Sequence, residues 1–321
     1  MTRLALAFSD FAQPLDPGGA PRLPALARLL SRGRLQAASA ASWRHWVLAS
    51  AGLSAPRQLP AAAILAGRAG TFAVATPLNL LAGLGHVHID PRGPLELRAA
   101  EWGELCAGFN REFGDAGLSL AACGRLGLLS LPRALDAVTH DPEPLAGREA
   151  GEWLPSGPDG GWLRRVMTEA QMWLHRHPLN EAREARGEMP VNALWLWGLG
   201  PDALRWAEAP PPALATDDPV LRCLWRRAGA PVRSPPASLA AWLGTPEQAG
   251  IVTLSLAAWC HEAGAALEAA ERSWFVPLAE ELAGGRVASA EVYLGGRVAI
   301  LGRADRLRFW RSTQAWHEAL Q

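Results

Sequence analysis

The stretch that decides the fold covers residues 152–200 and reads EWLPSGPDGGWLRRVMTEAQMWLHRHPLNEAREARGEMPVNALWLWGLG. It opens with the turn-rich segment LPSGPDGG. Residues 162–175 then carry apolar side chains at helical spacing, which predicts an amphipathic helix. Residues 193–197 (ALWLW) are apolar on both faces, as in a central strand that is buried between layers. A helix that leads into a buried strand and a glycine turn is typical of an α/β protein.

The same alternation extends along the rest of the chain. Periodicity predicts strands at 3–9, 71–76, 86–90, 125–131, 193–197 and 251–256, and helices at 23–30, 99–113, 162–175 and 259–282. Pro277 falls inside the last helical pattern, where we expect a kink or a fresh helix start. Tyr293 and residues 298–301 predict a terminal hairpin or edge. Strands that alternate with helices favour a sheet covered on both faces.

Composition limits the classes of function. The 321 residues carry 31 basic and 31 acidic side chains, so the formal charge of zero argues against a nucleic-acid-binding surface. All 31 basic residues are arginine, which excludes a Schiff-base or Walker-type lysine mechanism. No apolar run approaches the ~20 residues of a membrane span, and the four cysteines form no CxxC pair. With no recognisable leader after Met1, we expect a soluble, cytoplasmic protein without membrane partners.

The central stretch also contains a spaced polar motif. Its members are His177, Pro178, Asn180, Arg183, Pro190 and Asn192, followed by WLWGLG at 195–200. In this order and spacing the stretch resembles the archaeal-type cofactor-independent phosphoglycerate mutases of the alkaline phosphatase superfamily. Among these, it is most similar to a proteobacterial group of uncharacterised or regulatory mutase-like proteins.

The resemblance implies a fold and a substrate-binding surface. The fold would be a three-layer α/β/α sandwich of alkaline-phosphatase-like type, formed by one domain over residues 1–321 with a small inserted subdomain around 77–150. The implied substrate-binding side chains are His177, Asn180, Arg183 and Asn192. The resemblance to the family also extends, more faintly, to TFAVATPLNL (71–80) and VTHDPEPLAG (138–147).

The resemblance also implies a metal centre that this sequence retains only in part. Enzymes of the superfamily hold two divalent ions over a phosphorylated Ser or Thr, and hard cations require several Asp and His ligands. Asp10 stands where the family places a metal-binding aspartate. The late Gly-Asp-His-Ser-Thr-Pro signature has no counterpart in VAILGRADR (298–306), and the Asp-x-x-Gly-His-x-x-Asp element is reduced to AWCHEAGAALEA (258–269), which leaves His261. We therefore expect a degenerate site.

Each remaining polar candidate has a functional and a structural interpretation. Ser42 is a candidate nucleophile, or a helix cap. His86 and His88 share one strand face with Asp90 and are candidate metal or phosphate ligands, or an exposed strand face. His140 and Asp141 are a candidate base and its orienting carboxylate, or a turn cap.

These features lead to three functional hypotheses. The first is a catalytically impaired, mutase-like regulatory protein that binds a phosphorylated metabolite or a protein partner. The second is an active mutase or phosphotransferase with a Mn or Zn pair in a rearranged site. Its ligands would come from Asp10, His86, His88, His140, Asp141 and His261. The third is a purely structural interaction protein.

Overall fold

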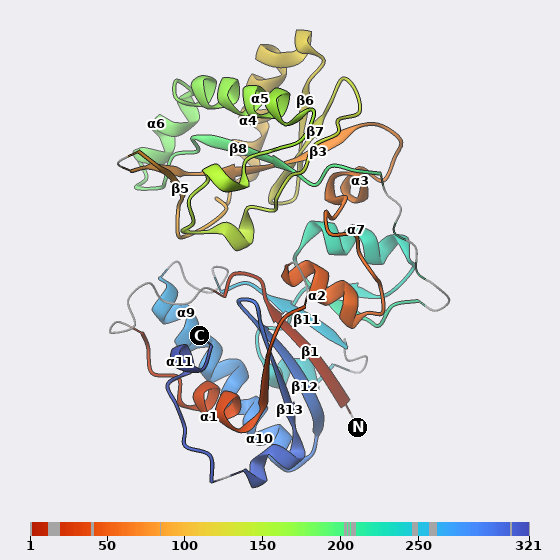
Figure 1. Ribbon diagram of the computed structural model, residues 1–321, viewed down its shortest axis with the longest axis vertical. Helices are drawn as coiled ribbons and strands as arrows, with labels where there is room; N and C mark the ends of the chain where they lie inside the picture. Colours follow the sequence, from red (N-terminus) through yellow and green to blue (C-terminus); the bar gives the residue numbers. More distant parts are fainter. Residues whose placement is uncertain are drawn as a thin grey trace. The chain divides into compact units, whose positions relative to one another are not determined.

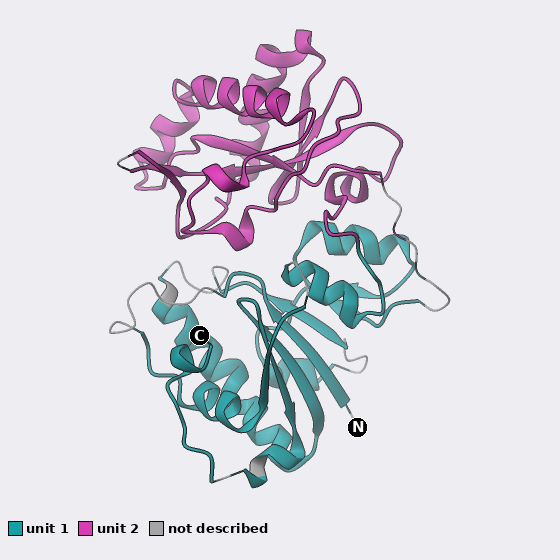
Figure 2. Cartoon of the chain, in the orientation of Figure 1, with its two compact units in different colours: residues 1–55, 205–321 teal, residues 56–204 magenta. Residues whose placement is uncertain are grey.

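The computed structural model describes residues 2–11, 20–39, 42–83, 85–201, 204, 206, 210–245, 250–256, 262–308 and 310–320. The chain divides into two compact units, which Figure 2 colours separately. Unit 1 comprises Met1–Ala55 and Arg205–Gln321, and unit 2 comprises Pro56–Leu204. Along the chain, unit 2 is thus inserted between the two parts of unit 1. The insertion expected around residues 77–150 lies within unit 2, and the single domain over 1–321 stays a prediction.

A mixed seven-stranded sheet forms the centre of unit 1 (Figure 1). Its spatial order is β10 (Val232–Arg233), β9 (Leu214–Ala215), β11 (Ile251–Leu254), β1 (Thr2–Phe8), β12 (Val287–Leu294), β13 (Arg297–Gly302) and β2 (Arg34–Ala37). The strands from β10 to β12 pair in parallel, and the two pairs β12–β13 and β13–β2 are antiparallel. The predicted α/β class is confirmed, as is the hairpin near the C-terminus.

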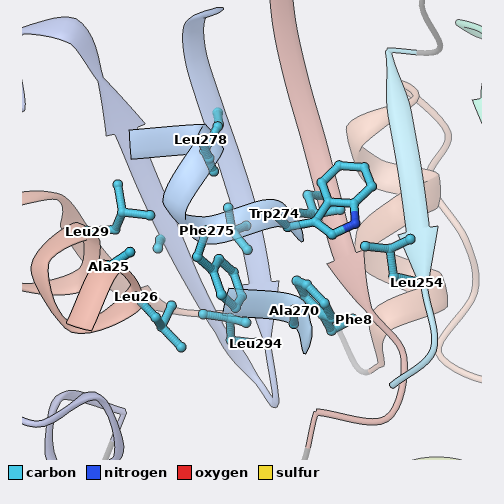
Figure 3. Packing of buried hydrophobic residues seen from close by; sticks show 14 of the residues in the cluster. Phe8, Ala25, Leu26, Leu29, Leu254, Ala270, Trp274, Phe275, Leu278 and Leu294 are labelled. Carbon is cyan, nitrogen blue, oxygen red and sulfur yellow. The ribbon is translucent and has the colours of Figure 1, made fainter. Parts of the chain in front are cut away.

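One face of this sheet carries the main apolar core. In β1 the side chains of Leu4, Leu6 and Phe8 point to this face, because alternate residues of a strand share a side. The elements that cover it are α1 (Pro24–Arg32), α8 (Leu239–Leu243), α9 (Ala263–Ala270), the π-helix η5 (Glu271–Phe275), α10 (Val276–Gly284) and α11 (Trp316–Ala319). Figure 3 shows Trp274 and Phe275 directed toward the strands, where both are fully buried.

The opposite face of the sheet carries the helix α2 (Trp43–Ser50), which packs on β1. The Trp46 ring of α2 lies 5.7 Å from the ring of Tyr293 on β12. Tyr293 alternates with Val292 and Leu294, which belong to the core on the other face. Unit 1 therefore has helices on both faces of its sheet, as the predicted three-layer arrangement requires.

The predicted helix at 259–282 is interrupted within its described part. It consists of α9, η5 and α10 in succession, and Pro277 stands in the first turn of α10. The backbone stays helical from η5 into α10. The π-helix lies directly before the turn that contains Pro277, so the regular α-helix is disturbed next to this proline, where a kink or a fresh start was expected. The π-helix also positions Glu271, whose carboxylate accepts the N–H groups of Ala25 (2.5 Å) and Leu26 (3.1 Å). Glu271 thereby caps α1, which has no side-chain cap of its own.

Unit 2 has a separate four-stranded antiparallel sheet. Its order is β6 (Ser119–Cys123), β7 (Leu126–Ser130), β3 (Phe72–Leu78) and β8 (Ala193–Trp197). Two helices, α4 (Ala99–Phe113) and α5 (Gly160–Leu174), lie on one side of it (Figure 1). Their side chains Phe109 and Met167 pack with Leu129 and Leu196 of the strands. The predictions for residues 99–113 and 193–197 are confirmed to the residue.

Shorter elements complete unit 2. They are α3 (Ala61–Ala66), the hairpin of β4 (Leu80–Ala82) and β5 (Val87–Ile89), the 3₁₀ turns η3 (Glu143–Leu145) and η4 (Gly151–Trp153), and α6 (Pro178–Glu184). Unit 1 also contains α7 (Pro219–Arg227). Across the described ranges of both units, every helix is too short or too polar to cross a membrane.

Candidate functional site

The carboxyl ends of the parallel strands in unit 1 bring several polar residues to one sheet edge. Open α/β sheets commonly bind their ligands at this edge. Asp10 follows β1 and Ser255 follows β11, so the two residues are adjacent although 245 positions separate them. The Asp10 carboxylate accepts hydrogen bonds from Ser255 Oγ and from the N–H of Leu256, each at 2.8 Å. The candidate metal ligand Asp10 is thus bonded to the neighbouring strand end.

A buried ion pair occupies the next position along the same edge. Asp218 follows β9, and its Oδ2 accepts hydrogen bonds from Arg44 Nη2 (2.8 Å) and Nε (3.1 Å). Both side chains are about 2% exposed. Asp218 Oδ1 caps α7 by accepting the N–H of Leu221 at 2.9 Å. The Arg44 guanidinium therefore supplies the positive charge that this buried carboxylate requires.

Two threonines extend this polar edge. Thr216 Oγ1 accepts the N–H of Asp218 at 3.0 Å and lies 2.5 Å from Thr253 Oγ1. Thr216 and Thr253 are both buried. The strand ends β9 and β11 are therefore joined by side-chain hydrogen bonds.

Ser42 stands at the N-cap of α2 and is buried. Its Oγ lies 2.8 Å from Nδ1 of His45 and accepts the His45 N–H at 3.4 Å. The cap geometry matches the structural interpretation of Ser42. The contact with the imidazole also provides a proton acceptor, so a nucleophilic role for Ser42 stays a prediction.

The donors required for a two-metal centre are not gathered together in the described ranges. No three His, Cys, Asp or Glu side chains there form a group suited to a metal ion. In unit 1, Asp10 and Asp218 are each bonded to protein donors. His261 lies outside the described residues. The donor set of the described edge therefore does not fit a pair of divalent ions.

The β4–β5 hairpin of unit 2 holds the candidates His86 and His88. His86 Nδ1 lies 2.7 Å from Glu149 Oε1 in an exposed pair, and His88 belongs to β5. Asp90 is buried and bonded to Arg92 at 2.7 Å. Burial opposes ionisation of Asp90, but the hydrogen bonds and charge of Arg92 hold its pKa below the ordinary value. A ligand role for these histidines stays a prediction.

His140 and Asp141 lie on the side of the unit 2 sheet opposite α4 and α5. Asp141 Oδ1 accepts the N–H of Glu143 at 3.1 Å, which is a turn-capping contact. The His140 ring is half-buried and meets the Trp153 ring edge-on at 5.3 Å. Burial, and then the charge of Arg57, lower the His140 pKa below its ordinary value. The lowered pKa favours the neutral form of the imidazole, and its use as a base with Asp141 stays a prediction.

The spaced motif of residues 177–192 connects α5, α6 and β8. His177 begins α6, and its Nδ1 accepts the N–H of Leu179 at 3.2 Å. Asn180 Nδ2 donates to the carbonyls of Leu174 and Val191, each at 2.9 Å, and its Oδ1 accepts the Val191 N–H at 2.8 Å. Asn180 thus fixes the end of α5 to the approach of β8.

The other two motif residues also make internal contacts. Arg183 Nε donates to the carbonyl of Met189 at 2.7 Å, and its Nη1 lies 3.1 Å from both carboxylate oxygens of Glu101 on α4. Asn192 bonds to the N–H and the carbonyl of Leu80 on β4 at 2.7 and 2.9 Å. The motif therefore holds unit 2 together, and its role in substrate binding stays a prediction.

Comparisons with known proteins agree with part of the sequence interpretation. A segment of 66 residues is 39% identical to a 2,3-bisphosphoglycerate-independent phosphoglycerate mutase of Methanothrix thermoacetophila, and covers 21% of this chain and 17% of that protein. A probable mutase of the same name from Geobacter sulfurreducens is 36% identical over 59 residues, 18% of this chain and 15% of its own length. Part of this chain is related to the phosphoglycerate mutases.

The mutase relationship is limited in extent. The matched segment spans about a sixth of the length of these curated relatives, and no family model matches the chain. The cofactor-independent phosphoglycerate mutase structure from Thermoplasma acidophilum aligns over 94% of this chain and 89% of its own, with 20% identity and a TM-score of 0.40. The predicted resemblance to archaeal-type mutases is confirmed in part, and the assignment to a regulatory group stays a prediction.

Two of the buried ion pairs in the structure could not be predicted from the sequence. Neither Arg44 nor Asp218 was singled out, because 174 residues separate them in the sequence. Glu101 was treated only as part of an amphipathic helix, although it binds Arg183 and Arg186. The local sequence signal for Glu101 is an acidic residue in the first turn of the predicted helix, which is typical of a helix N-terminus.

Proposed function

We propose that this mutase-like chain is a catalytically impaired cytoplasmic protein that binds a phosphorylated metabolite. The observation that carries the proposal is the bonding state of the two carboxylates at the strand ends of unit 1. Asp10 is bonded to Ser255 and Leu256, and Asp218 to Arg44. Both carboxylates therefore form hydrogen bonds with groups of the protein itself at the strand ends of unit 1.

Energetics support the same conclusion for Asp218. Recruitment of its carboxylate to a metal would displace the buried Arg44 guanidinium, which is about 2% exposed. Breaking a buried ion pair costs about 3–5 kcal/mol because one charge is left uncompensated. Similarity to mutases supports a phosphorylated small molecule as the ligand, since the named activity of those relatives acts on phosphoglycerate.

Two measurements on the full-length protein test this proposal. The first is thermal denaturation with 3-phosphoglycerate and other phosphorylated three-carbon acids, where we expect stabilisation of about 2.7 kcal/mol at a ligand concentration of 100 times Kd. The second is conversion of 3-phosphoglycerate to 2-phosphoglycerate with added Mn²⁺, where we expect none. Turnover that disappears in Asp10→Ala contradicts the proposal. Absence of stabilisation by every metabolite favours the structural interaction protein.

A specific contact favours an active phosphotransferase as the second candidate. Ser42 Oγ lies 2.8 Å from His45 Nδ1, so the imidazole can accept the hydroxyl proton as the oxygen attacks a phosphoryl group. This candidate requires a phosphoryl group to pass from a phosphorylated donor to Ser42 Oγ. The P–O bond to the donor breaks, and the donor oxygen leaves as a hydroxyl with the proton that His45 took from Ser42. Mass spectrometry after incubation with 3-phosphoglycerate tests it, with Ser50→Ala at the exposed end of α2 as the matched control for Ser42→Ala. An unmodified Ser42 removes this candidate.

A further inference from the structure

A surface of unit 1, here called the Trp310 surface, combines exposed apolar and basic side chains. It is formed by the 3₁₀ turn η6 (Arg303–Leu307) and the residues that follow it as far as Arg311. Trp310 is 70% exposed and Leu307 is 58% exposed, the two largest values among the large apolar side chains of the described residues. Every other tryptophan that the structure describes is buried or half-buried. This stretch therefore presents two apolar side chains to solvent.

The chain that carries these side chains is bonded to the rest of unit 1. The turn η6 follows directly on β13 and contacts α10. Arg308 Nη1 donates to the carbonyl of Arg32 at 3.0 Å, and Arg311 Nη1 donates to that of Gly33 at 3.2 Å. Both carbonyls lie at the C-terminal end of α1, where cations are favourable. The two bonds hold the stretch against α1 while its apolar side chains stay exposed.

Basic residues predominate on the Trp310 surface. Residues 303–311 read RADRLRFWR, with four arginines and one acid, Asp305. Asp305 Oδ1 is paired with Arg308 Nη1 at 3.0 Å. Arg303 and Arg311 are exposed and form no ion pair within the described part of the chain. The surface is therefore positively charged, although the formal charge of the whole protein is zero.

The end of α10 leaves this positive charge in place. The Arg303 guanidinium lies beside Gly285, which ends the helix. Glu281, one turn earlier, is paired with Arg286, whose side chain is 71% exposed. Glu280, the other acid of α10, is exposed and makes no ion pair with Arg303 in the described structure. Arg303 therefore remains available to an external anion.

We infer that the Trp310 surface binds the surface of a membrane that contains anionic lipids. The inference goes beyond the proposed function and does not depend on it. Guanidinium groups bind lipid phosphates, and an anionic leaflet attracts each basic residue close to it. Tryptophan is enriched where headgroups meet acyl chains, because the indole has an apolar body and an N–H donor. Leu307 adds a second apolar contact with the acyl boundary.

The form of the surface favours a membrane over a protein or a nucleic acid. Its apolar side chains project singly into solvent, whereas sites for helical or proline-rich peptides are grooves with apolar walls. A bilayer accepts projecting side chains without a complementary shape. The balanced charge of the chain argues against a nucleic acid. The expectation of no membrane partner rests on the lack of a spanning segment, and contact with a bilayer surface requires none.

Co-sedimentation of the full chain with lipid vesicles tests the inference. One set of vesicles contains equal parts of phosphatidylglycerol and phosphatidylcholine, and the other contains phosphatidylcholine alone. We expect the parent to bind the anionic vesicles more tightly than the neutral ones, and to bind them less tightly as the salt concentration rises. Leu307→Ser combined with Trp310→Ser should weaken binding to anionic vesicles by about tenfold. Arg303→Gln should weaken it by about fivefold.

Two exposed positions of α5 in unit 2 supply matched controls. Met172 is 56% exposed and Arg165 is also exposed, so Met172→Ser and Arg165→Gln make the same chemical changes away from the Trp310 surface. We expect both control variants to bind the vesicles as the parent does. Equal melting temperatures of the parent and all variants establish that folding is unaffected.

Several results would overturn the inference. One is a parent that does not bind anionic vesicles at low salt, and another is a double variant that binds them as tightly as the parent. If polyglutamate or an oligonucleotide binds with the same dependence on Trp310 and vesicles do not, the partner is an acidic macromolecule instead. If the parent ignores vesicles and forms a dimer that the double variant converts to a monomer, a second copy occupies the surface. Metabolite binding is measured separately, so none of these results decides the proposed function.

Discussion

Arg44 of unit 1 and two arginines of unit 2, Arg57 and Arg148, lie in opposite environments. In unit 1, Arg44 is buried and bonded to Asp218 at the carboxyl ends of the strands. In unit 2, Arg57 and Arg148 are exposed and form no ion pair within the described residues. At the carboxyl ends of the unit 1 strands, where α/β proteins commonly bind their ligands, the described carboxylates Asp10 and Asp218 are bonded to groups of the protein itself. The contrast is one of burial, because a buried guanidinium requires a partner carboxylate, whereas an exposed guanidinium is solvated.

Removal of the buried charge in unit 1 is expected to have the largest effect. Arg44→Met leaves the Asp218 carboxylate buried without its partner, and we expect a loss of about 3–5 kcal/mol in the free energy of unfolding. Urea denaturation measures the loss. The double variant Arg44→Met, Asp218→Leu is expected to recover a large part of it, because no unpaired charge then remains. A single variant as stable as the parent would show that the pair has no structural role.

Removal of the carboxylate that caps α1 is expected to cause the second largest loss of stability. Glu271→Ala leaves the N–H groups of Ala25 and Leu26 without their acceptor, with a loss of about 2–3 kcal/mol. Chemical denaturation followed by circular dichroism measures this loss. Glu268→Ala is the control, because Glu268 is exposed on the preceding helix. Equal stability of the two variants would contradict the capping role of Glu271.

Asp90 of unit 2 is expected to make a smaller contribution to stability, which is lost at acid pH. The pKa of Asp90 is lowered in the folded state, so its stabilising effect is complete above the ordinary value of 3.8 and is lost as the pH falls through the folded-state pKa. The melting temperature of the parent should therefore fall more between pH 6 and pH 3 than that of Asp90→Asn. Parallel pH profiles for the two proteins would refute this assignment.

The smallest effect on stability is expected for an exposed arginine of unit 1, which is compared with the buried Arg44. Arg272 lies 3.8 Å from Glu268, with 71% and 55% of the two side chains exposed. Arg272→Ala should change the free energy of unfolding by no more than about 0.5 kcal/mol, because solvent screens such pairs. Urea denaturation in parallel with Arg44→Met makes the comparison. Similar losses for both variants would mean that burial does not govern the stability of the arginine pairs.

Local patterns were sufficient to predict individual elements. The boundaries of α4 and β8 follow from apolar spacing and from the flanking polar and glycine residues. Pro277 lies where the π-helix changes to α10, close to the expected kink or fresh start. The division of the strands among separate sheets was not predicted, because strand periodicity does not specify the partner strand. β3 pairs with β7 and β8 in unit 2, although its pattern resembles that of β11 in unit 1.

The candidate site was predicted less well than the fold, and for a physical reason. Asp10 and the residues of the 177–192 motif were identified by type and spacing, but their bonds depend on groups distant in the sequence. Ser255 is 245 residues from Asp10, and Glu101 is 82 residues from Arg183. Sequence spacing alone does not show whether a polar side chain faces a ligand or another part of the protein.

The position of β1 has a consequence for the order in which the chain folds during synthesis. Both of its neighbours, β11 and β12, come from the last quarter of the sequence, and α1 receives its cap from Glu271. The sheet of unit 2 uses only residues between 72 and 197. On the ribosome, the sheet of unit 2 can form before β11 and β12 have been translated, so β1 is still without its two partner strands at that stage. A nascent chain arrested before residue 250 should therefore protect unit 2 from proteases and leave β1 accessible to them.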